Sequence, residues 1–314
     1  MPLSHDELDR IQRLRALFLD DARGDRALPD YWRDDADLRA YERVLGARIG
    51  WKWDAALSEC KDRGMPRTDD AIVLDFGCGA GIAAMRYARA FGAREILCQD
   101  RSPIARDYAA RAVAAAHPKI QARAIADADS DDCAFEVLLV SHVVSELDAA
   151  SIARLKDLAL RARFVVIVES GNKAAARKLA ALRDLLVPRM HVVAPCTHMA
   201  ACPSLRSPTD WCHFFAEPPQ AAFTEGEWAH AARDLGIDLR ALPYAFLCLS
   251  RDPIAATTPP HRLLGRPEIN KHDARVQLCE SGALREATID KRTKKDTWRL
   301  LKKDPASVRN LPSA

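Results

Sequence analysis

Two groups of residues in this sequence have the types and spacing needed for chemistry. The first is a glycine-rich loop, VLDFGCGAG, at 73–81. The second is a set of four cysteines. Cys196, Cys202 and Cys212 follow the spacing C-x5-C-x9-C, and Cys279 comes later in RVQLCESG. In a sequence with no sign of secretion, cysteines gathered in this way usually bind a metal ion or an iron–sulfur cluster.

The glycine loop indicates a site for a nucleotide-type cofactor. Asp75, Gly77, Gly79 and Gly81 directly follow an apolar run typical of a buried strand and precede a helix-like segment. Glycines let the backbone turn sharply and approach a ligand, and a helix N-terminus offers free N–H groups. Asp100 ends the next strand-like run, and its carboxylate can accept hydrogen bonds from both ribose hydroxyls.

The spacing D-x-G-x-G-x-G resembles the S-adenosylmethionine site of class I methyltransferases more than the G-x-G-x-x-G of NAD enzymes. In those methyltransferases the loop holds the methionine part of the cofactor. An acidic residue after the third strand, here Asp127 in DADSDD, reaches the adenine. The alternative is a loop of the same fold that binds no ligand.

The sequence has few of the motifs with which methyltransferases bind the methyl acceptor, and we assign no catalytic residue. The segment after the fourth strand reads SHVVSELD, which contains neither an Asn/Asp-Pro-Pro-aromatic motif nor a Pro-Cys pair. His142 and Glu146 could form an acid–base pair at i,i+4 helical spacing, or they could be a structural histidine and a surface carboxylate. The sequence therefore supports binding of the cofactor better than its use.

The cysteine site has two interpretations that spacing does not separate. A [4Fe–4S] cluster requires four thiolates, which Cys196, Cys202, Cys212 and Cys279 supply if the end of the chain folds back. A structural zinc ion needs four nitrogen or sulfur ligands, which the first three cysteines and either His198 or His213 could supply.

An alternating pattern of apolar strands and amphipathic helices predicts the framework that positions these groups. We expect an α/β fold with the mostly parallel, Rossmann-like sheet of a class I S-adenosylmethionine methyltransferase over residues 66–250, including a cysteine-rich insertion at 194–216. Residues 1–65 read as an N-terminal helical region. Residues 251–314 read as Pro-rich connecting material, a β-hairpin that turns at Ser281–Gly282, and a basic tail.

Charge and hydropathy limit the classes of protein to which this chain can belong. A net charge of +3 over 314 residues is too small to identify a nucleic-acid binder, but 291–303 carries seven Lys/Arg against one Asp. A solvated helix face is the alternative reading of that run. No apolar run approaches the roughly 20 residues that span a bilayer, and the charged N-terminus does not resemble a targeting segment. We expect a cytoplasmic monomer that does not contact membranes.

The chain resembles the methyltransferase-like assembly proteins of the mitochondrial small ribosomal subunit and their bacterial relatives. The motifs that carry the resemblance extend over most of the chain: AYERVLGARIGWKWDAAL, LDFGCGAG, VIVESGNKAAARKL, APCTHMAACP with DWCHF, and LGRPEINKHDARVQLCESG. The cysteine–histidine block P-C-x-H-x3-C-P followed by W-C-H-F is the specific part. Family members commonly have Glu-Pro-Gly where this chain has Glu169-Ser170-Gly171.

The resemblance implies functions for the residues singled out above. It implies that the four cysteines ligate a [4Fe–4S] cluster and that Asp75, Gly77, Gly79 and Asp100 line an S-adenosylmethionine pocket. It also implies a role on small-subunit rRNA in ribosome assembly or translation. We then expect the tail cations to contact phosphate without reading sequence: Lys291, Arg292, Lys294 and Lys295. Two other functions stay open, an active rRNA methyltransferase and a zinc-containing methyltransferase of a non-RNA substrate.

Overall fold

The computed structural model describes residues 3–19, 30–129, 133–254 and 259–311. Within them, the central sheet has the strand order β3-β2-β1-β4-β5-β8-β6, and a short β7 pairs with β8 off this path. Its strands are β1 (Ile72–Phe76), β2 (Glu95–Gln99), β3 (Gln121–Ile125), β4 (Val137–Ser141), β5 (Phe164–Ser170), β6 (His191–Ala194), β7 (Phe214–Phe215) and β8 (Pro243–Ser250).

The strand order confirms the predicted class I methyltransferase sheet. Neighbouring strands from β3 to β5 pair in parallel, whereas β8 is antiparallel to both β5 and β6 between which it lies. The central strands are short apolar runs such as VLLVS in β4, and they are buried because helices cover both faces.

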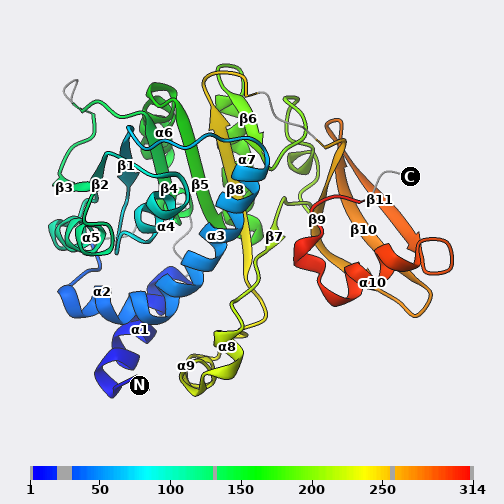
Figure 1. Ribbon diagram of the computed structural model, residues 1–314, viewed down its shortest axis with the longest axis horizontal. Coiled ribbons are helices and arrows are strands. Elements are labelled where there is room, and N and C mark those ends of the chain that lie inside the picture. Colours follow the sequence, from blue (N-terminus) through cyan, green and yellow to red (C-terminus); the bar gives the residue numbers. More distant parts are fainter. Residues whose placement is uncertain (1–2, 20–29, 130–132, 255–258, 312–314) are drawn as a thin grey trace.

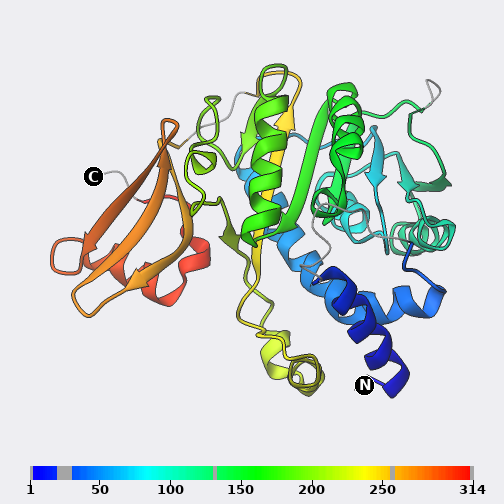
Figure 2. The ribbon, with the colours of Figure 1, turned by 180° about the vertical axis from the view of Figure 1, so that it is seen from behind.

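Helices form a layer on each side of this sheet (Figures 1 and 2). One layer contains α3 (Ala47–Asp62), α4 (Ile82–Phe91) and α5 (Pro103–Ala116), and the opposite layer contains α6 (Ala149–Arg161) and α7 (Lys173–Leu186). Their apolar stripes pack on the sheet as two separate cores. Trp53 and Tyr87 belong to the first core, and Leu155 and Leu179 to the second.

The N-terminal residues are helical, as predicted. α1 (His5–Phe18) begins with a capping box between Ser4 and Glu7, and α2 (Asp35–Tyr41) runs through the π-helical turn η2 (Glu42–Gly46) into α3. After β7, the chain leaves the sheet to form α8 (Ala221–Thr224) and α9 (Gly226–Leu235). The apolar side of α9 packs on α1 and on the α2–η2 segment.

The C-terminal residues form more than a hairpin, so the prediction that only connecting material precedes the hairpin was wrong in part. β9 (His261–Ile269), β10 (Asp273–Glu280) and β11 (Ala283–Asp290) make an antiparallel sheet in the order β11-β10-β9. The predicted hairpin turn is confirmed, with positive φ at Ser281 and Gly282. β9 was missed because it contains Pro267, which a strand tolerates at a sheet edge.

The basic tail is also an ordered element. α10 (Lys295–Lys303) packs Trp298 and Leu301 against this sheet, and the short turn η5 (Pro305–Ser307) follows. We call residues 259–311 the C-terminal module. It lies beside the central sheet, with β9 next to β7 (Figure 1). In the part of the chain that the structure describes, none of the helices combines the length and apolar character needed to cross a membrane.

Candidate functional site

The glycine loop connects β1 to α4 with a backbone that requires glycine. Gly77, Gly79 and Gly81 all have positive φ, at 69°, 49° and 76°, a region that residues with a Cβ rarely adopt. At Gly77 an added Cβ would lie 2.5 Å from Cγ2 of Val143. At Gly79 the nearest neighbour would be Trp32, at 3.8 Å. The loop is therefore closed on one side and leaves space on the other.

Asp75 and Asp100 border the loop from two adjacent strands. Asp75 is fully buried, and its Oδ2 accepts a hydrogen bond from the N–H of Ala84 at 3.3 Å. Burial raises the pKa of Asp75 to about 7. The carboxylate of Asp100 accepts from the N–H of Gly79 at 3.0 Å and of Ser102 at 2.9 Å. Asp100 thereby fixes the end of β2 to the glycine loop.

This arrangement leaves polar atoms available for a ligand. Oδ1 of Asp75 and the hydroxyl of Ser102 are buried and have no hydrogen-bond partner among the described residues. Ser102 is the N-cap residue of α5 but makes no side-chain cap bond. Each oxygen of Asp100 keeps lone pairs beyond the one that its backbone partner uses. The set fits a ligand that carries a cationic group and hydroxyl donors.

Asp127 differs from the other predicted cofactor residues. It lies in the loop after β3 with its side chain 63% exposed, and its carboxylate is 3.3 Å from Arg154. Its Oδ1 also accepts from the N–H of Asp129 at 2.9 Å. Asp127 is therefore already paired at the surface, whereas Asp75 and Asp100 are buried.

A group of buried and half-buried polar side chains on the acceptor side was largely missed from the sequence. Glu169 at the end of β5 is fully buried, its Oε1 accepts from the N–H of Val144 at 2.7 Å, and its Oε2 has no partner among the described residues. Burial raises the pKa of Glu169 to about 7. Burial, with nearby Arg48, lowers the pKa of Lys52 to about 8, and Glu169 partly offsets this. Lys52 lies between two buried tryptophans in GWKWD. This apolar sequence setting is the pattern from which the unusual environment of Lys52 could have been predicted.

His142 belongs to the same group but not in the predicted way. It follows β4 with a left-handed φ of 57°, and Glu146 lies in the 3-10 turn η3 (Val144–Glu146), so the two do not share a helix face. The Nε2 of His142 is buried without a partner among the described residues. Burial, followed by the charge of Lys52, holds the pKa of His142 well below its usual value. A backbone held in this conformation is typical of functional sites.

Aromatic residues from the N-terminal region close over these groups. Trp32 faces the open side of Gly79. Burial raises the pKa of Tyr31 well above its usual value, and the charges of Glu146 and Asp100 raise it further, so Tyr31 lies within electrostatic reach of both carboxylates. The segment before α2 thus covers both the cofactor side and the acceptor side of the candidate site.

The four cysteines predicted as ligands are brought to one place. Burial raises the pKa of Cys212, and the charges of Cys196, Cys202 and Cys279 raise it further, so these thiols lie within electrostatic reach of one another. Nε2 of His198 is 3.3 Å from Sγ of Cys279, which joins the insertion to β10. The fold-back of Cys279 is therefore confirmed.

Arg183 of α7 holds the backbone of the cysteine-rich loop in place. It is 2% exposed, and its guanidinium donates to the carbonyl oxygens of His198 and Ala200, both at 2.8 Å. Asp184 accepts from the N–H of Cys202 at 2.9 Å. The loop is thus held mainly through its backbone, while Sγ of Cys202 lies 3.1 Å from the hydroxyl of Ser204.

These thiols do not form a ready site for a single metal ion. Across the described ranges, no group of three His, Cys, Asp or Glu side chains is placed to hold one. A structural zinc ion would require its ligands at roughly 2.0–2.3 Å in a tetrahedron. An iron–sulfur cluster separates its thiolates further because each binds a different iron atom. Metal binding by the four cysteines therefore remains a prediction.

The four tail cations lie at the start of α10 and just before it. Arg292, Lys294 and Lys295 are exposed, whereas Lys291 is half-buried with its Nζ 4.4 Å from the ring centre of Trp298. Lys302 approaches the same ring at 5.2 Å. The buried indole therefore anchors a helix whose outer surface is basic.

Comparison with solved structures finds proteins of similar architecture at low identity. Magnesium protoporphyrin IX methyltransferase (ChlM) from Synechocystis PCC 6803 with bound SAH is 13% identical, over 79% of this chain and 95% of that one, with a TM-score of 0.42. The plantazolicin methyltransferase BpumL in complex with SAH is 12% identical, over 78% and 98%, with a TM-score of 0.41. No curated protein matches the chain. The assignment of the fold rests on the strand order, not on these likenesses.

A family comparison is more specific. The family described as Mitochondrial small ribosomal subunit Rsm22 matches residues 53–304 of the 314-residue chain. This range includes the glycine loop, the cysteine-rich insertion and the C-terminal sheet. The chain belongs to the Rsm22 family.

Proposed function

We propose that this protein binds S-adenosylmethionine and small-subunit rRNA and acts in ribosome assembly or translation, with a structural [4Fe–4S] cluster. The observation that carries the proposal is the family match, which spans the glycine loop and all four cysteines. The name of the family refers to the small ribosomal subunit, and the proposal transfers that association to this chain.

The donor set around the glycine loop supports S-adenosylmethionine as the cofactor. The free Oδ1 of Asp75 would receive the ammonium group of the methionine part, and Asp100 would receive the ribose hydroxyls. Asp127 would contact the adenine after exchanging its partner Arg154. When bound, the cofactor supplies an electrophilic methyl group.

Two roles are compatible with that cofactor site. In the first, the protein is an assembly factor that binds cofactor and rRNA without catalysis, which the absence of a recognised acceptor motif in SHVVSELD favours. In the second it is an rRNA methyltransferase. The group formed by the buried Glu169 and the half-buried Lys52 and His142 favours the second role, because a neutral imidazole and a carboxyl of raised pKa can exchange a proton with an acceptor.

The cluster would be held by Cys196, Cys202, Cys212 and Cys279, and its contribution is structural. It would connect the insertion after β6 to β10 of the C-terminal module, two segments far apart in sequence. Because ligand binding of this kind contributes directly to folding free energy, loss of the cluster is expected to loosen the module. A zinc ion at the same thiols is the alternative.

The C-terminal module would then present the basic residues Lys291, Arg292, Lys294 and Lys295 to rRNA phosphates. We propose that residues 1–65, 66–250 and 251–314 are the three units of the protein. Monomeric state and cytoplasmic location remain predictions.

Sedimentation tests the proposal. The protein should migrate with small-subunit particles through a sucrose-type density gradient. When Lys291, Arg292, Lys294 and Lys295 are replaced by glutamine, the protein should no longer bind the particles and should stay at the top of the gradient. Asp100→Ala separates the two roles: full rescue of cells that lack the protein means that methyl transfer is not its essential task. Migration away from small-subunit particles under all salt conditions would contradict the proposal.

A further inference from the structure

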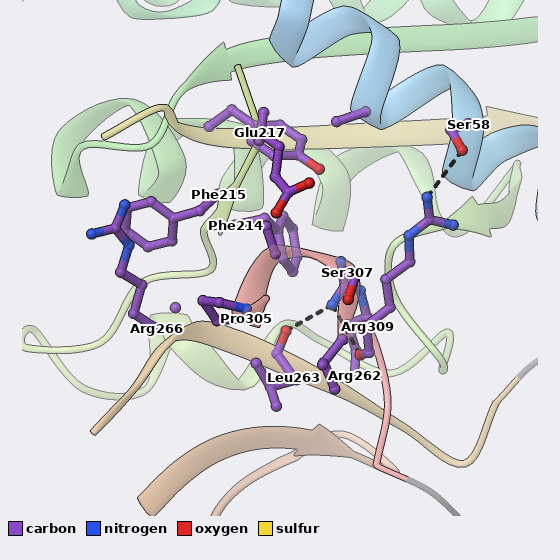
Figure 3. Close-up of a pocket in the computed structure, with 16 residues that line it drawn as sticks. Ser58, Phe214, Phe215, Glu217, Arg262, Leu263, Arg266, Pro305, Ser307 and Arg309 are labelled. Atoms are coloured by element: carbon purple, nitrogen blue, oxygen red, sulfur yellow. Dashed lines mark hydrogen bonds between the residues drawn. The ribbon is translucent and has the colours of Figure 1, made fainter. Parts of the chain in front are cut away.

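A cavity of about 200 Å³ lies where the C-terminal module meets the central sheet (Figure 3). Its walls come from β7, β8 and α3 on one side and from β9 and η5 on the other. None of the cysteines and none of the glycine-loop residues line it. The cavity is small beside the roughly 300–1,000 Å³ of sites for drug-sized ligands, which suits a single planar group.

The wall on the side of the sheet is aromatic. Phe214 and Phe215 of β7 line the cavity together with Tyr244 of β8. The ring of Phe215 is half-buried and stands 5.6 Å, edge to face, from that of His213, which in turn stacks on Trp211 at 4.8 Å. The rings of Trp211, His213 and Phe215 therefore form a row that ends at the cavity.

A β-bulge places a cation over the end of this row. The pairing of β9 with β10 shifts between Arg275 and Gln277, opposite Gly265, whose φ is +62°. Bulges of this kind redirect a side chain. Here the exposed Arg266 lies with its guanidinium 4.2 Å from the ring centre of Phe215 (Figure 3). Its Nη2 donates to the carbonyl of Arg240, another exposed arginine.

The other two arginines of the cavity are already neutralised. Arg262 is 5% exposed and donates to both carboxylate oxygens of Glu59, at 3.1 and 2.9 Å. Arg309 donates to Asp62 at 2.5 Å and to Ser58 at 3.1 Å. The interior is therefore not an anion site, and the positive charge available to a ligand lies at the rim with Arg266.

We propose that this cavity receives one unstacked base of the RNA that the protein binds. The base would lie against Phe215, and its phosphate would pair with Arg266 and Arg240 at the rim. Glu217 and Ser307 line the cavity. Glu217 shares a hydrogen bond with Asp304 and the hydroxyl of Ser307 donates to the Asp304 carbonyl at 3.0 Å, so Glu217 would exchange its partner and Ser307 would accept with its oxygen to meet the base edge. Aromatic rings and guanidinium planes are the surfaces that hold splayed-out bases of single-stranded RNA. The inference rests on the proposed function and adds to it the site and the type of RNA recognised.

Binding of a short single-stranded RNA, compared with the same strand carrying abasic riboses, tests the inference. Wild-type protein should bind the base-containing strand more tightly. Phe215→Ala should weaken that complex about fivefold or more and leave the abasic complex unchanged. Phe223→Ala removes an exposed ring on α8 and is the matched control. Arg266→Lys keeps the charge but not the two-pronged guanidinium that would pair with the phosphate, so it should weaken the complexes with both strands by a similar factor. Arg123→Ala, on β3 at the far edge of the sheet, is its control.

The outcomes separate the two proposals. If wild-type protein binds neither strand, both the proposed function and this inference are wrong. If it binds RNA but Phe215→Ala, or the volume-keeping Phe215→Leu, affects both strands equally or not at all, only the cavity assignment is wrong. Thermal unfolding of each variant shows whether the fold is kept.

Discussion

Glu59 of α3 and Arg262 of β9 form a buried, two-pronged ion pair between residues 203 positions apart. Their side chains are 1% and 6% exposed. Arg309, after η5, stands 3.6 Å from the same carboxylate. One glutamate of α3 thus attaches two segments of the C-terminal module.

Removing that carboxylate should detach the module. Glu59→Ala leaves Arg262 buried without its counter-ion, so we expect a loss of about 3–5 kcal/mol in the free energy of unfolding. Urea unfolding measures this loss, and limited proteolysis should cleave first near the module. Glu280→Ala, which breaks an exposed pair with Arg285, is the control and should cost less than about 1 kcal/mol. Equal effects of the two variants would refute the attachment role.

Glu169 should make the protein less stable as pH rises. Its pKa is raised from 4.5 to about 7 in the folded state, so the folded protein binds the proton more tightly than the unfolded chain does. The resulting stabilisation is present below pH 4.5 and is lost as pH rises to about 7. Glu169→Gln should therefore reduce the difference in unfolding free energy between pH 5 and pH 8. The exposed Glu286→Gln serves as control and keeps the wild-type difference. A Glu169→Gln protein with the full wild-type pH dependence would contradict this assignment.

Cofactor affinity should depend on the two buried aspartates. Asp75→Asn and Asp100→Asn each remove a charged acceptor, so calorimetry should show S-adenosylmethionine binding weakened about tenfold or more. Asp127→Asn should have a smaller effect because that side chain is exposed and paired. Asp129→Asn, which pairs with the same Arg154, is the matched control. Unchanged affinity in both buried variants would mean that the glycine loop does not hold this cofactor.

Cys279 distinguishes the two metal interpretations. Under the cluster interpretation, anaerobically purified protein is brown, Cys279→Ser loses the colour, and His198→Ala keeps it. Under zinc bound with His198, the protein is colourless and metal analysis shows that His198→Ala loses zinc while Cys279→Ser retains it. Cys133→Ser, a buried cysteine outside the insertion, controls for general loss of packing.

Short-range sequence patterns predicted those elements whose conformation depends mainly on neighbouring residues. The strand before the glycine loop, the positive φ at 281–282 and the helices over the sheet follow from short-range apolar periodicity and from glycine chemistry. The cysteine pattern indicated a metal site that includes Cys279, and the resemblance favoured a [4Fe–4S] cluster over zinc at that site.

The remaining features depend on contacts between distant segments. β9 was hidden because Pro267 argues against a strand unless it lies at an edge, and edge position is a property of the whole sheet. The sequence does not reveal that Lys52 lies near Glu169 and His142, because the three residues come from α3, the end of β5 and the turn after β4. The ion pair of Glu59 and Arg262 has no short-range signature either.

Crosslinking of the protein to RNA in cells, followed by sequencing, tests the central claim most directly. The account predicts strong enrichment of one region of the small-subunit rRNA. It also predicts that replacing Lys291, Arg292, Lys294 and Lys295 by glutamine reduces this enrichment. Crosslinks spread over unrelated RNAs, or no rRNA enrichment at all, would contradict it.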